Sequence, residues 1–140
     1  MSNARVLSKQ GNAPIFSATK SATQSIPATT ITKVTFDTKQ FDTANAFDNV
    51  TNHRFNPKIA GYYKIDVNLY NSGTITGQAI ISKNGAVLIY GPYNAGTGQA
   101  VTGLFYLNGS TDYLEASVFY ATSGTLSTSC FFQGFLAQAS

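Results

Sequence analysis

The segment from Arg54 to Asn71, with the sequence RFNPKIAGYYKIDVNLYN, decides the fold. After a break at Pro57 and a turn through Ala60-Gly61, apolar and polar residues alternate to its end. One side carries Tyr63, Ile65, Val67 and Leu69, and the other carries Tyr62, Lys64, Asp66, Asn68 and Tyr70. A period of two residues is typical of a strand with one buried face. We therefore predict a central β-strand whose core residues are the first four.

The composition indicates a single, β-rich domain. A chain of 140 residues fits one domain, and only 11% of its residues are charged, against ~25% in ordinary globular domains. The single Cys130 excludes an intramolecular disulfide, and its apolar neighbours predict a small buried side chain. The first residues lack the apolar core of a signal peptide, and no run approaches the ~20 apolar residues of a membrane span. We expect synthesis in a reducing cytoplasm and no membrane insertion.

Positive charge gathers near the N-terminus. The net charge is +3, and four bases, Arg5, Lys9, Lys20 and Lys33, precede the first acid, Asp37. Residues 1–13 are polar and end before Pro14, so they are predicted to form an extended basic attachment arm, followed by a folded domain over residues 14–140. This distribution does not suggest a nucleic-acid groove.

Short apolar runs precede the central strand. Residues 15–18 predict a first strand, and residues 31–36 alternate so that Val34 and Phe36 face the core while Ile31 faces solvent. Residues 37–52 hold Phe41 and Phe47 among polar residues, which predicts a long loop anchored by aromatic side chains.

More strands follow the central one. A turn is predicted at residues 71–73, then a strand over 74–83 with Ala79 and Ile81 on one side. Asn84-Gly85 is a strong signal for a tight hairpin into a strand over 86–90. Residues 91–98 read as a loop by composition, and three strands are expected within 99–108, 112–121 and 127–137. The pattern predicts an all-β antiparallel sandwich with almost no helix.

Two of these strands are apolar on both faces. Val101, Phe105 and Leu107 share one side of their strand, and Leu104 and Tyr106 the other. In the last strand, Phe131 and Phe135 lie opposite Cys130, Phe132 and Leu136. A sandwich has one core, so the second face needs another place to be buried. Subunit association would supply it, and loops of the same chain are the alternative.

Four short motifs resemble the C1q-like domains of the C1q/TNF superfamily. Phe55, Gly61, Tyr63 and Ile65 match the F-x5-G-x-Y-x-F segment, with Ile65 in place of an aromatic residue. Residues 132–136 match the closing F-x-G-F-L motif, and residues 83–85 match the K-N-G hairpin. Residues 107–112 are similar to the L-x-x-G-D turn, with extra residues before Asp112. The resemblance covers the chain from about Phe16 to Leu136.

The resemblance implies a jelly-roll sandwich of about ten strands that assembles as a homotrimer. It places the first and last strands in an inner sheet facing the three-fold axis. We predict an interface of Tyr62, Leu104, Tyr106, Phe131 and Phe135, with Phe132 and Leu136 joining the four core residues of the central strand. Which side of the last strand faces the axis stays open at this point.

No collagen-like Gly-X-Y stretch precedes the domain. A bare domain with a short basic arm and a surface rich in Thr and Asn is similar to the C1q-like modules of bacteriophage structural proteins. That setting implies a virion-surface protein made in the host cytoplasm: a head fibre, capsid decoration or tail-fibre tip. The partners would be its own copies and a capsid or tail protein that binds the arm. The alternative is a module that binds a host-surface glycan or protein through loops, with Tyr90, Tyr93 and Asn94 as candidates because tyrosine offers a flat apolar face with a polar tip.

No residue set predicts an enzyme or a cofactor. His53 is the only histidine and lacks triad spacing, and Cys130 lies among aromatic residues. The one oxygen-rich group comprises Asp37, Asp42, Asn45, Asp48 and Asn49. Its spacing is not that of an EF-hand, and side-chain turns in a loop explain it, so no metal site is predicted.

Overall fold

The computed structural model describes residues 13–140, which form twelve strands and no helix. The strands are β1 Ile15–Thr19, β2 Gln24–Ile26, β3 Thr32–Lys33, β4 Thr38–Asp42, β5 Phe47–Asp48, β6 Arg54–Phe55, β7 Gly61–Lys83, β8 Ala86–Tyr90, β9 Asn94–Leu107, β10 Leu114–Tyr120, β11 Gly124–Leu126 and β12 Phe131–Ala139. The predicted arm lies outside the described residues except for Ala13. Residues 13–140 hold no helix long and apolar enough to cross a membrane.

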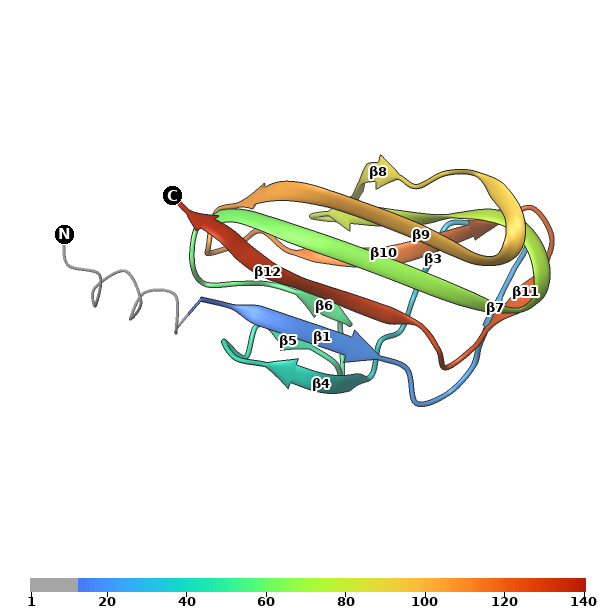
Figure 1. Cartoon of the computed structure of the whole chain (residues 1–140), viewed down its shortest axis with the longest axis horizontal. Helices are drawn as coiled ribbons and strands as arrows, with labels where there is room; N and C mark the ends of the chain where they lie inside the picture. Colours follow the sequence, from blue (N-terminus) through green and yellow to red (C-terminus); the bar gives the residue numbers. More distant parts are fainter. Residues whose placement is uncertain (1–12) are drawn as a thin grey trace.

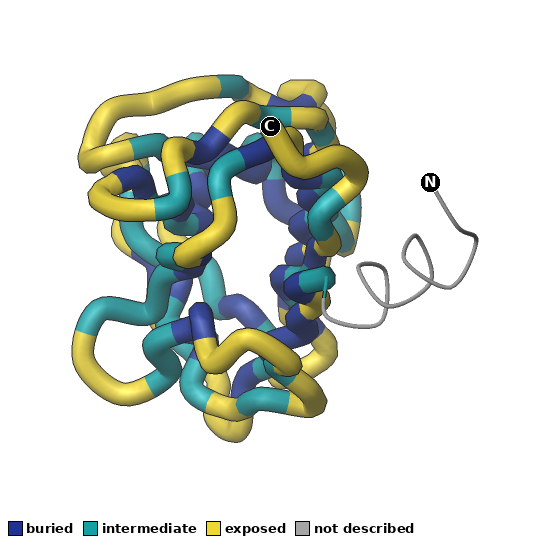
Figure 2. The backbone as a smooth tube through the Cα atoms, turned by 90° about the vertical axis from the view of Figure 1, so that its left-hand side faces the viewer, coloured by how far each residue is buried: buried dark blue, intermediate teal, exposed yellow. Residues whose placement is uncertain are grey.

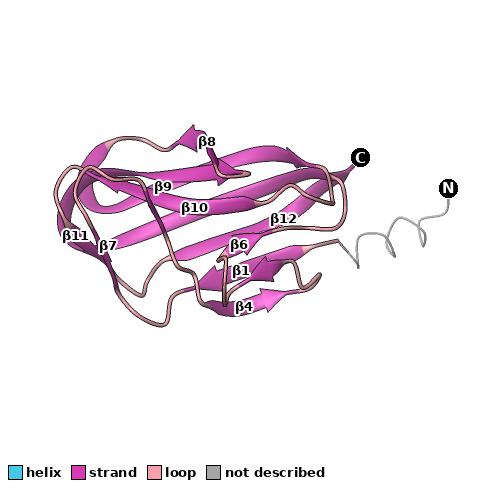
Figure 3. Ribbon diagram, turned by 180° about the vertical axis from the view of Figure 1, so that it is seen from behind, coloured by secondary structure: helices cyan, strands magenta, loops and turns pink. Residues whose placement is uncertain are grey.

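Two antiparallel layers form the sandwich, and β7 belongs to both (Figures 1 and 3). Its first half pairs with β12 and β9, and the first layer continues through β1 to β4. Its second half pairs with β10 and β8, and the short strands β3 and β6 lie beside β10. The predicted all-β antiparallel jelly roll with a central strand is confirmed, although the structure has twelve strands where about ten were expected.

The turn predicted at residues 71–73 is wrong in its form. The chain stays in strand geometry through this region and bends from one layer into the other, with a register shift against β9 between Tyr70 and Ile75. A chain of buried hydrogen bonds holds the bend. The hydroxyl of Tyr120 donates to Asn71 Oδ1, Asn71 Nδ2 donates to Gln99 Oε1 at 2.9 Å, and Gln99 Nε2 donates to the Ile75 carbonyl at 3.1 Å. Buried polar side chains need hydrogen-bond partners, and the bend brings the partners of these three side chains within reach.

Two predicted loops contain strands. The segment 37–52 includes β4, which pairs with β1 as the edge of the first layer, and β5, which pairs with β6. The loop predicted at 91–98 ends after Tyr93, since β9 already begins at Asn94. Polar composition suggested loops, but edge positions let these residues pair on one side and meet water on the other. The pair β2 and β11 was not predicted at all.

Aromatic side chains fill the interior, which Figure 2 shows as buried backbone around the inside of the fold. The rings of Phe16 and Phe55 are stacked with centroids 4.1 Å apart, and Phe132 meets Phe16 edge-on at 5.2 Å. The predicted orientation of residues 31–36 is confirmed, because Val34 and Phe36 are fully buried while Ile31 is exposed. The structure buries Tyr63, Ile65, Val67, Leu69 and Phe132 and packs the half-buried Leu136 against them.

The hairpin between β7 and β8 has the predicted geometry. Asn84 and Gly85 take φ values of 54° and 85°, and the strands pair on either side of them. A type I′ turn requires positive φ at both central residues, which explains the Asn-Gly sequence.

Gly85→Val should destabilise the fold by roughly 1 to 3 kcal/mol, because a β-branched residue resists positive φ. Space is not the cause, since a Cβ at Gly85 would have only the Tyr113 hydroxyl nearby, at 3.7 Å. Gly85→Asn is the matched control, because asparagine tolerates this conformation. Thermal unfolding followed by circular dichroism measures both. Equal melting temperatures for Gly85→Val and the unmodified protein would contradict the turn assignment.

Candidate functional site: the exposed aromatic face

Large apolar side chains gather on the outer face of the first layer. Six of them are between 41% and 58% exposed: Ile15, Phe41, Tyr62, Leu104, Tyr106 and Phe135. They come from all five strands of the layer, β4, β1, β12, β7 and β9. We call these six residues the aromatic face. Exposed apolar side chains gathered on one face of a small domain make that face a candidate interaction site.

Strand register places these side chains beside one another. Ile15 pairs with Phe135, Phe135 pairs with Lys64, and Lys64 pairs with Leu104. Directly paired residues point to the same side of a sheet, so this row crosses four strands on the outer face. Tyr62 pairs with Tyr106 one step along, and their rings meet at 5.5 Å between centroids. The face is therefore fixed by backbone pairing.

A small polar group lies within the aromatic face. Lys64 Nζ is 3.1 Å from Asp66 Oδ1, which also accepts a hydrogen bond from the Thr102 hydroxyl at 2.5 Å. The Thr102 hydrogen bond, and then Lys64, hold the pKa of Asp66 below its usual range. The group carries no net charge, because its one ammonium and one carboxylate balance.

The register puts all five predicted interface residues on this one face. Phe131 joins the others because it pairs with Asn68, which points the same way as Tyr62 and Lys64. Sequence reasoning missed Ile15 and Phe41. Ile15 was given no face, and Phe41 was assigned to a loop. Each of these two residues is an apolar side chain at an outward position of its strand. That position can be recognised only once β4 is known to pair with β1.

Solved structures with the same fold come from animal and viral proteins. The globular domain of zebrafish complement 1qA superimposes with a TM-score of 0.65 at 20% identity, covering 91% of this chain and 99% of that chain. Murine APRIL gives 0.67 at 14% identity, covering 89% and 98%. The PRD1 vertex protein P5 gives 0.64 at 16% identity, covering 89% and 94%.

The chain has a C1q/TNF-like jelly-roll fold. No protein-family model and no curated protein sequence matches it. At these identities the likeness rests on backbone arrangement, and it agrees with the fold that the four sequence motifs imply.

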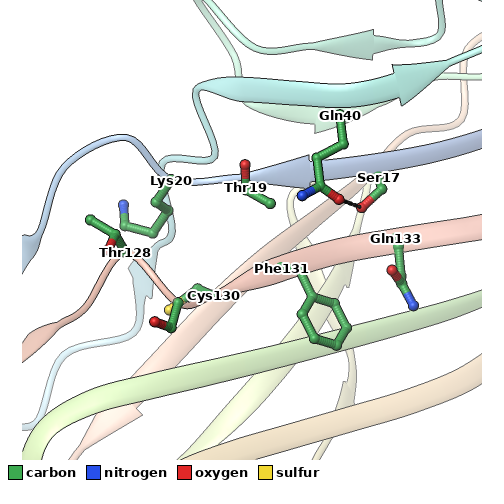
Figure 4. Close-up of a pocket in the computed structure, with 9 residues that line it drawn as sticks. Ser17, Thr19, Lys20, Gln40, Thr128, Cys130, Phe131 and Gln133 are labelled. Atoms are coloured by element: carbon green, nitrogen blue, oxygen red, sulfur yellow. Dashed lines mark hydrogen bonds between the residues drawn. The ribbon is translucent and has the colours of Figure 1, made fainter.

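A polar hollow of about 410 Å³ lies beside the aromatic face of this jelly roll, lined by Ser17, Gln40, Phe131 and their neighbours (Figure 4). Lys20 borders it but is fully engaged, since its ammonium donates to Gln24 Oε1 and to both oxygens of Thr35. Burial lowers the pKa of Lys20 and raises the pKa of the Cys130 thiol. Cys130 is therefore a protonated thiol, bonded to the backbone of Tyr70 and Ser127, and a poor nucleophile.

The candidate ligand loop divides between two surfaces. Tyr90 lines a cavity of about 540 Å³ together with Pro92 and residues 100–102 of β9. Tyr93 and Asn94 do not line it, and the Tyr93 ring lies 6.4 Å from Phe119 of β10. All three residues are exposed. The structure therefore does not bring the two tyrosines into a single binding pocket.

The aspartates of the oxygen-rich group accept hydrogen bonds from backbone amides. Asp42 accepts hydrogen bonds from the amides of Ala46 and Phe47, and Asp37 accepts from Ser21. Asp48 accepts from the amides of Val50, Thr51 and Asn52. Within residues 13–140 no three acidic, histidine or cysteine side chains are grouped as a metal site. His53 Nδ1 lies 2.9 Å from the Phe36 carbonyl.

Asp48→Asn should destabilise the protein in a pH-dependent way. The amides of Thr51 and Val50 lower the pKa of Asp48 from 3.8 to about 2. A depressed folded-state pKa contributes stability that is present above 3.8 and lost as pH falls to about 2. We expect the melting temperature of the variant to be lower at neutral pH and to converge on that of the unmodified protein between these limits. A difference that stays constant across this window would contradict the assignment.

Proposed function

We propose that the protein is a non-enzymatic structural module that assembles as a homotrimer and is displayed on a virion surface as a head fibre, capsid decoration or tail-fibre tip. The observation that carries the proposal is the aromatic face, six half-exposed apolar side chains fixed in register on one layer of a C1q/TNF-like fold. The C1q/TNF resemblance implies that this layer faces a three-fold axis.

Burial of the face favours association energetically. The exposed half of each of these side chains would contribute about 1 kcal/mol on burial, and the gain recurs in every subunit. Aromatic residues at the centre of an interface often dominate its binding energy. A face with few net charges also avoids the cost of burying unpaired ions. We expect an interface of roughly 2,000 Å² or more in total, the size of permanent assemblies.

Two observations support a virion setting. One structural neighbour is named as a vertex protein, that of PRD1. The start of β1 and the C-terminus lie at one end of the domain, while the connection into β9 curves round the other end (Figure 1). Residues 1–13 would therefore attach at one end, to a capsid or tail protein, and leave the opposite end outward. Synthesis in the host cytoplasm fits the single reduced cysteine.

A non-enzymatic role is supported by the state of the reactive groups. The Cys130 thiol is buried, and His53 Nδ1 lies within hydrogen-bond distance of the Phe36 backbone carbonyl. The second candidate function is recognition of a host-surface glycan or protein by loops. The exposed Tyr90, Tyr93 and Asn94 favour it.

Phe135→Asp should convert the trimer to monomer or aggregate, because three like charges would meet near one axis. Tyr93→Asp is the matched control, since Tyr93 is similarly exposed but lies off the aromatic face. Light scattering at micromolar concentration should give about three times the 14.9 kDa chain mass for the unmodified protein and the control. A single-chain mass for the unmodified protein would refute the trimer.

Deletion of residues 2–13 should abolish incorporation into particles and leave the trimer intact. The arm makes its contacts with the particle, whereas the described fold is complete from Ile15 onward. The measurement is the amount of protein that co-sediments with purified particles, with light scattering of the free protein as the control. Normal incorporation of the shortened chain would show that attachment lies elsewhere.

A further inference from the structure

Three cations within residues 13–140 lack an acidic partner: Lys20, which is buried and hydrogen-bonded to Gln24 and Thr35, and Arg54 and Lys58, which line one cavity. The ion pairs of residues 13–140 join Lys33 to Glu115, Lys39 to Asp42, Lys64 to Asp66 and Lys83 to Asp112. Arg54 and Lys58 have no carboxylate within ion-pair distance in that range. Residues 1–12 contain no Asp or Glu, so they supply none either. The cavity that Arg54 and Lys58 share has a volume of about 410 Å³.

The charge of the cavity is positive. Its lining includes three cations, Lys39, Arg54 and Lys58, and one carboxylate, Asp48. Asp48 is already satisfied by three backbone amides and by Asn52 Nδ2, and Lys39 is 3.1 Å from Asp42. Neutral amides do not cancel the charge of Asp48, so with Asp42 counted three cations face two carboxylates and the cavity has a net charge of +1. Lys58 Nζ donates to Asn56 Oδ1 and to the Ser110 carbonyl, and neither of these acceptors is charged.

The position of the Arg54 side chain is restricted by its contact with an aromatic ring. Its guanidinium carbon lies 4.0 Å from the centre of the Tyr113 ring, a cation–π contact that fixes the plane of the group. Its backbone pairs with Asp48 in the β5–β6 hairpin, and Asp48 in turn ties the connecting turn. A planar guanidinium presents parallel N–H donors that match carboxylate and phosphate oxygens. Little side-chain freedom would be lost on binding.

Asparagine side chains supply neutral hydrogen-bonding groups around these cations. Asn45, Asn49, Asn52 and Asn56 all line the cavity. Within the described part of the chain, Asn45 Nδ2 and the Oδ1 atoms of Asn49 and Asn52 have no hydrogen-bond partner. Hydroxyl groups both donate and accept, so they can bond to free amide nitrogen and oxygen atoms alike. A ligand rich in hydroxyls fits this part of the lining.

We propose that this cavity binds an acidic saccharide residue. The carboxylate or phosphate of the sugar bonds Arg54 and Lys58, and its hydroxyls bond the free asparagine amide groups. A volume of about 410 Å³ lies within the ~300 to 1,000 Å³ range of small-molecule sites. The cavity contains none of the six residues of the aromatic face, so binding does not require the proposed trimer.

The test is a titration of the full-length protein followed by amide chemical shifts. The probes are glucuronic acid, glucose 6-phosphate, glucose and inorganic phosphate. We expect one or both acidic sugars to bind at least tenfold more tightly than glucose and inorganic phosphate, with shifts centred on Asn45, Arg54 and Asn56. Arg54→Gln and Lys58→Gln should each weaken that binding about tenfold. Lys64→Gln, a change at a half-exposed lysine whose partners Asp66 and Thr102 lie outside the cavity, should not weaken it.

Shifts with none of the four probes would refute the proposed site. Binding of glucuronic acid alone or of glucose 6-phosphate alone supports it and names the anionic group. Equal binding of glucose would refute the role of the charge, and equal binding of inorganic phosphate would reveal an ion site only. Affinity that survives in both glutamine variants would overturn the residue assignment. Light scattering of the same samples separates these results from the trimer, because a monomer that binds acidic sugar would refute only the assembly.

Discussion

The architecture depends on one bend, in which β7 passes from the first layer to the second. A single strand of 23 residues supplies the central position of both layers, so the two sheets cannot slide or separate without breaking it. The bend is secured by Tyr120, Asn71 and Gln99, whose polar atoms are buried and bonded to one another. Burying such groups unpaired would cost several kcal/mol, so the network selects one geometry for the corner.

The alternation of residues 62–70 was enough to predict the central strand, and the series of short strands separated by turn signals predicted the all-β class. The Asn84-Gly85 hairpin was equally readable, because positive φ is a local requirement. The bend was not readable, because Asn71, Ser72 and Gly73 have the composition of a turn. Only the distant partners of Asn71, on β9 and β10, make the strand continue. Local composition indicates which conformations a segment can adopt, and pairing with distant strands selects one of them.

The aromatic face and the cationic cavity also differ in how far each could be predicted from the sequence. The aromatic face could be read in part from strands that are apolar on both sides, since Tyr62, Leu104 and Phe135 each occupy an outward position in an alternating pattern. Phe41 and Ile15 complete the face only through the pairing of β4 with β1. The cationic cavity left no sequence signal. Arg54 and Lys58 stand out only after the structure shows that four of the other lysines have acidic partners.

The distribution of charge separates the two surfaces physically. On the aromatic face, Lys64 and Asp66 neutralise each other, so burial of the face requires no unpaired ion to leave water. In the cavity, Arg54 and Lys58 contact only uncharged partners, so the attraction of their charges for the proposed anion is not cancelled by a carboxylate bound to either of them. A surface suited to permanent burial and one suited to reversible binding thus have opposite electrostatic requirements. The proposed interface and the proposed binding cavity use separate residues, so substitutions can test the two proposals one at a time.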